Sequence, residues 1–269
     1  EEGLATLGGS TPAPKTKVVA GQVIEYPEPE EVRWEPDPDV EFDVLHEDEH
    51  LAVIDKPAGL VVHTGAGRSV PTLAGGLLAR WPVMREVGEP GRWGLVHRLD
   101  RDTSGALLVA KSDDVLWDLQ DQLRRRDVSR TYAAMVEGTF DAPTGTIDAP
   151  IDRDPDQPTR RAVTPFGRPS RTHYRLEESF ENPPVSLLEV TLETGRTHQI
   201  RVHMAAIEHP VVAARLYGRS STPGLGLDRT WLHAKQLAFT HPVSGEDLVV
   251  DSPLPDVLAA TLVDLRAAD

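Results

Sequence analysis

Apolar runs along the chain predict a series of β-strands from about residue 40 onward. Each run is rich in Val, Leu, Tyr or Thr and is bounded by Gly, Pro or Asp, as strands usually are. The predicted strands are Phe42–Glu47, Leu51–Asp55, Gly105–Lys111, Thr131–Gly138, Arg171–Glu178 and Val185–Glu193. A further short strand is expected over Val18–Glu25, around a turn at Ala20-Gly21.

Helical periodicity predicts two helices, Thr72–Trp81 and Ser112–Arg125. Ser112 is expected at the N-cap of the second helix, with acidic residues in its first turn and arginines in its last, which matches the helix dipole. The segment Gln199–Ala206 either begins a third helix or continues a strand. Mostly adjacent strands with a few flanking helices favour an α+β fold around a mixed, mostly antiparallel sheet.

The first part of the chain differs from the rest in composition. Residues 1–39 are rich in Pro and acidic side chains, and they are predicted to form a stiff acidic linker. Residues 40–269 are predicted to form one catalytic domain.

Composition excludes several classes of protein. The chain has 269 residues and no cysteine, so disulfides, thiolate metal sites and cysteine nucleophiles are excluded. No uncharged apolar run approaches the roughly 18 residues that cross a bilayer. The N-terminus has neither the basic start nor the apolar core of a signal peptide, so a cytoplasmic location is expected.

The net charge of −15 is unevenly distributed. Residues 1–50 hold 14 acidic and 3 basic side chains, whereas the remaining 219 hold 29 acidic and 25 basic ones. Two stretches are locally basic, 124–130 and 153–175, and the second contains Arg160 and Arg161. Such arginines either contact phosphates or form a solvated face. The global charge therefore neither excludes an RNA partner nor suggests one.

A first polar cluster lies between two apolar runs, in Gly94-Leu-Val-His-Arg-Leu-Asp-Arg-Asp-Thr-Ser-Gly105. So many polar groups between strands indicate a surface loop. Acidic and basic groups this close can hold one another ionised, which suits a carboxylate that attacks rather than takes up a proton. The alternative is an ion-paired turn capped by Asp102, Thr103 and Ser104.

A second polar cluster is Glu193-Thr-Gly-Arg-Thr-His-Gln-Ile-Arg-Val-His203. If this segment is extended, Arg196, His198, Ile200 and Val202 share one face, and Thr197, Gln199, Arg201 and His203 share the other. An arginine fixed here is suited to grip a carboxylate with two parallel hydrogen bonds. The alternative is a solvent-facing strand edge.

Two other chemistries lack their patterns. His198 and His203 are five residues apart and no His-Glu-x-x-His occurs, so zinc hydrolysis lacks its ligands. Ser104 lacks the glycine two residues earlier that a nucleophile elbow requires. The residues thus indicate an enzyme with a carboxylate and arginine site, without naming its reaction.

Several motifs, in order, resemble those of the pseudouridine synthases that modify large-subunit ribosomal RNA and some transfer RNAs. The resemblance covers about residues 40–255, and its most specific part is His97-Arg-Leu-Asp-x-x-Thr-Ser-Gly105. The other matching segments are Val53–His63, Tyr132–Gly138, Gly195–His203, His209-Pro-Val-Val, Leu216-Tyr-Gly218, Leu232-His-Ala and Phe239-Thr-His-Pro242.

The resemblance implies a role for each matching residue. Asp100 is the expected essential carboxylate, Tyr132 is expected to stack on the target base, and Arg201 is expected to pair with Asp100. No cofactor and no metal are expected. The expected partner is RNA, either 23S ribosomal RNA or a transfer RNA, bound by a monomer across a cleft between two halves of the sheet. The expected RNA contacts are His97, Arg98, Arg196, His198, Arg160 and Arg161.

Two departures from the family pattern leave questions. Ala213 and Ala214 stand where relatives usually have Gly and Asp, which puts the local turn in question. Residues 17–30 look like the last strand of an S4-type RNA-binding domain whose remainder is missing. The rival enzyme is a carboxylate nucleosidase or glycosidase that uses Asp100 with Asp102, and the rival without turnover is an RNA-binding relative.

Overall fold

The computed structural model of the chain describes residues 5–13, 15–26, 35–63, 70–157, 159–218 and 225–268. The chain divides into a smaller unit, Glu1–Arg33 with Gly65–Arg68, and a larger unit, Trp34–Thr64 with Ser69–Asp269. The middle of the predicted linker, residues 27–34, lies outside the described residues. No helix within the described ranges is long and apolar enough to cross a membrane.

The smaller unit contains one short antiparallel strand pair, β1 (Thr6–Leu7) with β2 (Ile24–Glu25). The predicted strand Val18–Glu25 is therefore confirmed only at its last two residues. A turn precedes them, because the N–H of Gln22 donates to the carbonyl of Val19 and the side chain of Gln22 accepts from the N–H of Val19. These bonds occupy the backbone groups that a strand partner would need. The domain boundary near residue 40 stays a prediction.

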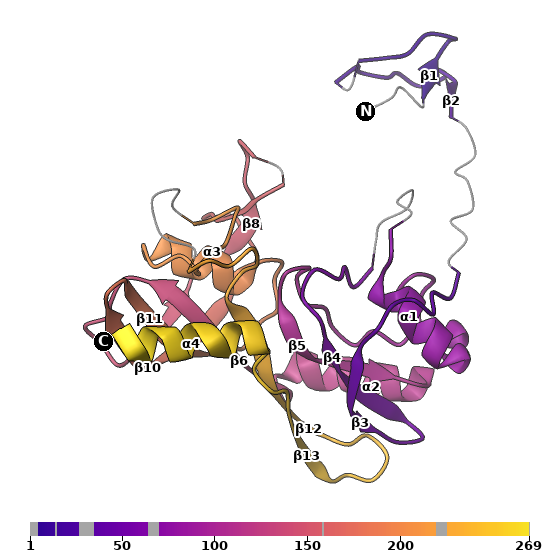
Figure 1. Cartoon of the computed structure of the whole chain (residues 1–269). Helices are drawn as coiled ribbons and strands as arrows, with labels where there is room; N and C mark the ends of the chain where they lie inside the picture. Colours follow the sequence, from indigo (N-terminus) through magenta and orange to yellow (C-terminus); the bar gives the residue numbers. More distant parts are fainter. Residues whose placement is uncertain are drawn as a thin grey trace. The chain divides into compact units, whose positions relative to one another are not determined.

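The larger unit is built on one nine-stranded mixed sheet (Figure 1). Its strand order is β3-β4-β5-β12-β6-β11-β10-β7, and β13 pairs with β12. The bounds are β3 Asp43–Glu47, β4 Leu51–Lys56, β5 Ser104–Ala110, β6 Ser129–Glu137, β7 Thr144–Asp148, β10 Arg171–Glu181, β11 Pro184–Leu192, β12 Leu232–Thr240 and β13 Asp247–Asp251. Every pairing of described strands in this sheet is antiparallel except that of β5 with β12. The predicted α+β fold with a mostly antiparallel sheet is confirmed.

Helices cover both faces of this sheet. Successive side chains along each strand point to opposite faces of the sheet. Ile54 and Leu107 therefore pack in one core cluster, whereas Val53 and Leu108 pack in another. The first cluster holds the apolar residues of α1 and α3, the second those of α2, and a third those of α4 along β6 and β11 (Figure 1). The bounds are α1 Leu73–Arg80, the 3₁₀ helix η1 Pro82–Glu86, α2 Asp113–Arg125, α3 Gln199–Ala206 and α4 Asp256–Ala268. A separate hairpin pairs β8 (Ile151–Arg153) with β9 (Arg161–Val163).

The six strands predicted after residue 40 and the two predicted helices are confirmed within a few residues. Thr72 caps α1, because its side chain accepts from the N–H of Gly75 at 3.2 Å. Ser112 occupies the N-cap position of α2 but makes no side-chain cap. Sequence patterns did not predict β7, β8, β9, β12, β13 or α4.

Gln199–Ala206 forms helix α3, so the helical alternative for this segment is confirmed and the extended alternative, with its alternating faces, is wrong. His198 has a left-handed backbone with φ of 60°, which turns the chain into α3 at Gln199. Arg201 and His203 are buried in this helix. The reading of this segment as a solvent-facing strand edge is therefore also wrong.

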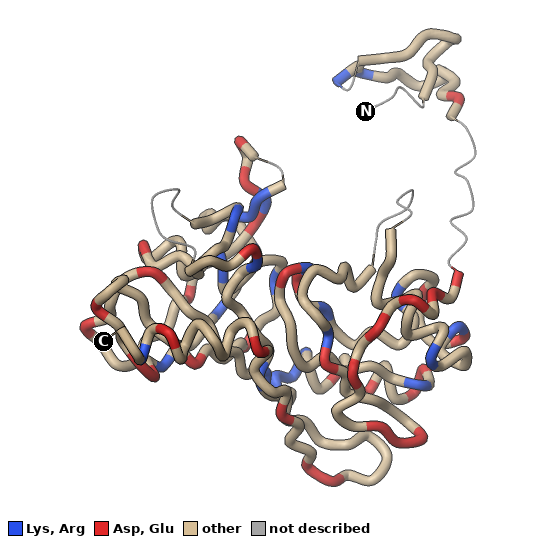
Figure 2. Tube along the Cα trace, in the orientation of Figure 1, with Lys and Arg blue, Asp and Glu red and all other residues tan. Residues whose placement is uncertain are grey.

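Acidic and basic residues are interspersed over the larger unit rather than gathered on one basic face (Figure 2). The basic stretch at the end of α2 is ion-paired: Arg124 and Arg125 contact Asp121, and Arg126 contacts Glu193. These three arginines are more than half exposed, so they belong to a solvated face. Their distribution favours the second of the two interpretations for this stretch.

A carboxylate in the β3–β4 turn ties two hairpins of the sheet together. Asp48 Oδ1 accepts from the backbone N–H groups of His50 at 2.7 Å and Leu51 at 2.9 Å. Asp48 Oδ2 lies 3.1 Å from Nε2 of both His46 and His241, and His241 follows β12. Burial raises the pKa of Asp48, but these hydrogen bonds outweigh it and hold the pKa at about 2.

Asp48→Asn should therefore destabilise the fold at neutral pH, and this destabilisation should disappear in acid. The depressed pKa adds stability that is present above the ordinary Asp pKa near 3.8 and is lost as pH falls through about 2. The expected difference in unfolding free energy is about 2 kcal/mol at pH 7. Urea unfolding at pH 7, 5, 3 and 2 measures it, with exposed Glu49→Gln in the same turn as control. A gap between Asp48→Asn and wild type that stays constant down to pH 2 contradicts the assignment.

Candidate active site

A cavity of about 490 Å³ lies where β5, β6, α2 and α3 meet. Its walls come from the loop before β5, the end of α2, the start of β6 and the segment from Leu192 to Arg201. Seven of the residues singled out in the sequence line it: His97, Arg98, Asp100, Tyr132, Arg196, His198 and Arg201. Arg160 and Arg161 are not among the residues that line this cavity.

An ion pair joins the two polar clusters of the sequence. Arg201 Nη1 donates to Asp100 Oδ2 at 3.2 Å, although the two residues are 101 positions apart. The side chain of Arg201 is 7% exposed and that of Asp100 is 17% exposed. A charge buried this far needs its partner, because removal of either one leaves the other uncompensated. The guanidinium of Arg201 also lies over the ring of Tyr217, 5.0 Å from its centroid.

An aromatic side chain forms the wall beside this ion pair. Tyr132 lies in β6, where its neighbours across the sheet are Val190 in β11 and Ala234 in β12. Its side chain is buried, and burial raises the pKa of the phenol; nearby Asp100 acts in the same direction, against Arg130. The phenol therefore stays neutral at physiological pH and presents an uncharged ring.

The loop that carries Asp100 is held from below by a buried lysine. Lys56, the last residue of β4, is fully buried, and its ammonium group donates to the carbonyls of Pro57, Leu60 and Arg101 at 2.7, 3.0 and 3.1 Å. Burial lowers the pKa of Lys56 to about 7, with Arg229 acting in the same direction. The three carbonyls match the three N–H donors of an ammonium group, so this charge is fully hydrogen-bonded.

His97 fixes the other end of the loop. Its Nε2 accepts from the backbone N–H of Leu108 in β5 at 3.2 Å. Burial lowers the pKa of His97 to about 3, and the charge of Arg130 acts in the same direction. The ring is therefore neutral at physiological pH and is engaged with the backbone. Arg98, the next residue, is exposed.

The alternative interpretation of this cluster, an ion-paired turn capped by Asp102, Thr103 and Ser104, is wrong for Ser104, because Ser104 begins β5 and is buried. Its hydroxyl accepts from Arg229 Nη2 at 2.9 Å and lies 2.9 Å from His233 Nδ1. The hydroxyl therefore donates to Nδ1, and His233 Nε2 donates to the carbonyl of Ser252 at 3.1 Å. This serine–histidine pair is sealed from solvent, so it supports the loop rather than attacking a substrate. Asp102 is bound by its neighbour Arg101, whose Nε donates to Asp102 Oδ1 at 2.9 Å.

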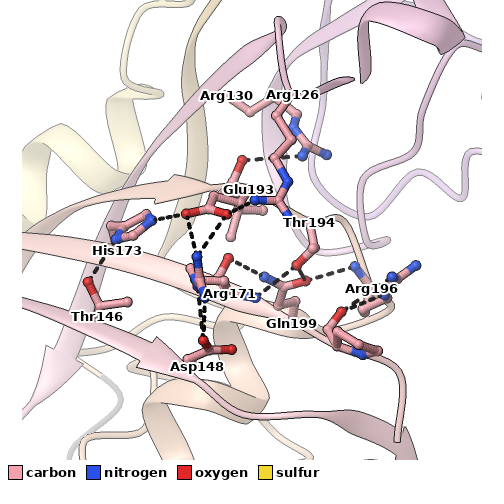
Figure 3. A network of polar contacts seen from close by, with 12 residues as sticks. Arg126, Arg130, Thr146, Asp148, Arg171, His173, Glu193, Thr194, Arg196 and Gln199 are labelled. Atoms are coloured by element: carbon pink, nitrogen blue, oxygen red, sulfur yellow. Dashed lines mark hydrogen bonds and ion pairs between the residues drawn. The ribbon is translucent and has the colours of Figure 1, made fainter. Parts of the chain in front are cut away.

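A polar network shapes the segment that precedes α3 (Figure 3). Gln199 Oε1 accepts from the hydroxyl of Thr194 at 2.8 Å and from the N–H of Arg196 at 3.0 Å. Glu193 accepts from Arg126, from Arg171 and from His173 Nε2. Arg196 donates to the carbonyl of Pro169 at 3.3 Å. The side-chain oxygen of Gln199 thus acts as the hydrogen-bond acceptor that a backbone carbonyl would otherwise provide. It closes the turn before α3, the helix that carries Arg201.

Tyr217 connects the remaining candidate residues. Its hydroxyl accepts from the backbone N–H of Arg161 at 2.9 Å and lies 2.8 Å from His198 Nδ1, so it donates to that nitrogen. The guanidinium of Arg160 lies 5.2 Å from the centroid of the same ring. Burial lowers the pKa of His198, so its imidazole is neutral at physiological pH. Arg160 and Arg161 therefore contact the same tyrosine side chain that Arg201 contacts, although neither lines the cavity.

The turn that carries Tyr217 is present despite its unusual sequence. Ala213 has a left-handed backbone with φ of 58°, a conformation that glycine adopts without strain. An alanine there costs about 1–2 kcal/mol in this turn. Ala214 is buried, and its carbonyl accepts from the N–H groups of Tyr217 and Gly218. The departure from the family pattern therefore strains the turn without removing it.

Three residues of the site were not singled out from the sequence: Lys56, Arg130 and Tyr217. Lys56 and Tyr217 lie inside motifs that match the family, which was the available signal. Arg130 was grouped with a surface stretch, whereas it is buried and donates to the carbonyl of Leu192 at 3.3 Å. Within the described residues, no group of three or more His, Asp or Glu side chains is arranged to hold a metal ion.

Comparisons with known proteins agree on one family. Residues 50–206 match the sequence profile described as RNA pseudouridylate synthase. Ribosomal large subunit pseudouridine synthase D of Nitrosomonas europaea is 48% identical over 229 residues, which cover 83% of this chain and 65% of that protein. The synthase D of Xanthomonas campestris is 44% identical and covers 99% of this chain and 82% of its own length. The solved structure of Human RNA Pseudouridylate Synthase Domain Containing 1 superposes with a TM-score of 0.67 at 28% identity and covers 84% of this chain and 90% of its own.

Lys56→Met should loosen the Asp100 loop, because three buried carbonyls lose their donor. Amide hydrogen exchange should rise at least about tenfold at Gly59, which donates to the carbonyl of Arg101, and at Thr103, which donates to that of Asp100. The control is Lys235→Met, which removes a half-exposed lysine paired with Glu189. Equal exchange at Gly59 and Thr103 in the two variants would remove Lys56 from the support of the loop.

Proposed function

Because the chain belongs to the RNA pseudouridylate synthase family, we propose that it isomerises uridine to pseudouridine in large-subunit ribosomal RNA, with Asp100 as the catalytic carboxylate. The chain spans 65% of the N. europaea relative and about four fifths of the X. campestris one. Both relatives are named for the large ribosomal subunit, which supports 23S ribosomal RNA as substrate over a transfer RNA.

The observation that carries this proposal is the buried contact between Asp100 and Arg201 at the floor of the cavity. A carboxylate can act on the sugar in two ways once the C1′–N1 bond breaks. It attacks C1′ and later leaves, or it takes a proton from C2′ and returns it. In both routes the electrons of the broken C1′–N1 bond go to the uracil, which rejoins C1′ through C5. The C5 proton is then lost to solvent, and N1 takes up a proton from solvent. No atoms are gained or lost, so no co-reactant is needed.

Detached uracil must rotate without leaving the cavity. Tyr132 supplies an uncharged aromatic wall beside Asp100, which suits stacking on a flipped base. The cavity volume lies within the roughly 300–1,000 Å³ of sites that enclose small ligands. Arg201 is proposed to hold the Asp100 carboxylate in place, through a contact that is shielded from water.

The residues proposed to contact RNA differ in whether their side chains already bond to other groups of the protein. Arg98 is exposed at the mouth of the cavity, which favours contact with phosphate. Arg196 and His198 line the cavity but also hold the turn before α3. Arg160 and Arg161 form no ion pair within the described part of the chain, so their charge is available to RNA from behind Tyr217. The neutral ring of His97 is suited to hold the loop beside the flipped base rather than to contact phosphate.

The rival activities are less well supported. A nucleosidase or glycosidase needs two carboxyl groups on opposite sides of the sugar. Asp102 lies two residues from Asp100 and is held by Arg101, which disfavours it as a second acid. An RNA-binding relative without turnover would not need the Asp100–Arg201 pair. We also propose that the protein acts as a monomer, in the cytoplasm.

Asp100→Asn should fold and bind RNA but form no pseudouridine. Asn has nearly the shape of Asp, yet it cannot attack or deprotonate the sugar, and loss of an essential nucleophile typically costs a factor of about 10⁴ or more. Release of tritium from [5-³H]uridine in an unmodified 23S transcript measures turnover. Asp102→Asn is the matched control and should lose at most a few-fold.

Three results of this assay separate the candidate functions. A synthase releases only the C5 proton, a nucleosidase frees uracil, and a binding protein frees neither. Turnover that survives Asp100→Asn and is abolished by Asp102→Asn would show that the carboxylate has been assigned to the wrong residue.

Arg201→Ala should cut turnover by about 10² or more, as loss of one charged contact at a reacting centre does. Arg201→Lys should recover little of it, because lysine lacks the planar fork and its charge would sit elsewhere. Arg266→Ala, which removes an exposed arginine on α4 paired with Glu178, is the control and should keep full turnover. Single-turnover rates with saturating RNA measure the effect, and a near-normal rate for Arg201→Ala would exclude Arg201 from the reaction.

A further inference from the structure

We propose that a second cavity beside the Asp100 cavity binds another nucleotide of the RNA, whose base stacks on Trp117 and whose phosphate lies near Arg92. This inference rests on the proposed function, because it assumes that the strand carrying the target uridine continues across this surface. The second cavity has a volume of about 430 Å³. The lining residues that bear on its ligand are His63, Glu89, Arg92, Arg98, Trp117 and Gln120.

The two cavities share a wall and a helix. Val96, His97 and Arg98 line both of them. On α2, Trp117 and Gln120 line the second cavity, and Arg124 lines the first. Steps of three and four residues keep these side chains on one face of the helix. Seven residues of helix span about 10 Å, so one strand of nucleic acid that fills the first cavity reaches the second without a detour.

Trp117 is the feature that points to a base. Its side chain is 63% exposed, whereas the other described tryptophans, Trp81, Trp93 and Trp231, are buried. It belongs to none of the core clusters, so it contributes little to packing. A large apolar ring left open in a concave surface is typical of a binding site. Exposed aromatic rings bind bases of any sequence, because every base has a π-face.

The charges around the cavity suit a phosphate. Arg92 and Arg98 form no ion pair with any carboxylate within the described ranges, unlike the arginines at the end of α2. Burial, together with the charges of Arg98 and Arg92, lowers the pKa of His63 to about 4, so the imidazole is neutral. Glu89 is the single acidic residue among those lining the cavity, and with Gln120 it offers hydrogen-bonding groups to a base edge. An indole, two free guanidinium groups and polar groups match a nucleotide better than an apolar peptide.

The physical need for such a cavity follows from the reaction. A uridine that enters the first cavity leaves its stack, and its neighbour loses a stacking partner. A second aromatic surface restores that contact and offsets part of the cost of opening the RNA. Trp117 therefore acts on binding of the opened strand rather than on the chemistry at Asp100.

The test compares Trp117→Ala, Trp117→Phe and Arg92→Ala with wild type in binding to an unmodified 23S transcript. Trp117→Ala should raise Kd about tenfold at every salt concentration, because stacking carries no charge. Trp117→Phe should stay within about threefold of wild type, since it keeps a ring. Arg92→Ala should weaken binding at low salt and reduce the salt slope by about one unit. Val263→Ala, at a residue 64% exposed on α4, is the control and should match wild type.

Each outcome decides one question. An unchanged Kd for Trp117→Ala, or equal Kd values for Trp117→Ala and Trp117→Phe, overturns the inference. If the wild-type protein forms no pseudouridine but its RNA binding depends on the Trp117 ring, the proposed function is refuted. The inference that the second cavity binds a nucleotide is then still supported. Thermal unfolding of each variant checks that the fold is kept. We expect that it is kept, because each substituted side chain is exposed.

Discussion

The whole site depends on the place where β5 meets β12. Only two residue pairs join these strands, Ser104 with His233 and Gly105 with Ala234, and they form the single parallel junction of the described sheet. A side chain at Gly105 would come within 2.3 Å of the carbonyl of Ala234, and its φ is +116°, so no other residue fits. This junction holds β3, β4 and β5 against the remaining strands. The loop that ends at Thr103, just before this junction, must therefore open at the seam between the two halves of the sheet.

Polar groups stabilise this seam because backbone pairing there is short. Beneath the loop, the hydroxyl of Ser104 forms hydrogen bonds with His233 and Arg229. Beside the loop, Lys56 donates hydrogen bonds to three carbonyls. Buried polar groups of this kind add little net stability, but each is costly to leave unpaired. They therefore select one loop conformation over its alternatives. That conformation presents Asp100 to Arg201, whose charge α3 carries in from the other half of the sheet.

The sequence predicts the parts of this arrangement that depend on local patterns. Strands such as Leu51–Lys56 follow from continuous apolar runs, and α2 follows from its charged ends and apolar stripe. The state of Gln199–Ala206 was open, because Ile200 and Val202 suit a helix and a strand alike; the turn closed by Gln199 decides it. The pairing of Asp100 with Arg201 came from family resemblance, since no spacing rule connects residues 101 positions apart. Lys56 and Tyr217 were missed as site residues because burial is a property of the tertiary fold.

An acidic chain can bind RNA if its few unpaired arginines are well placed. The count of basic residues is a poor guide here, since Arg124, Arg125, Arg126, Arg171 and Arg175 are ion-paired with carboxylates of the same chain. An arginine in such a pair attracts a phosphate less strongly, because a carboxylate already neutralises its charge. The unpaired arginines near Asp100 lie at the rims of the two cavities or behind Tyr217. In the proposed complex with RNA, so few arginines are free for phosphate that affinity must come in larger part from aromatic surfaces and the shape of the cavities. These are the features that distinguish an opened strand from a duplex.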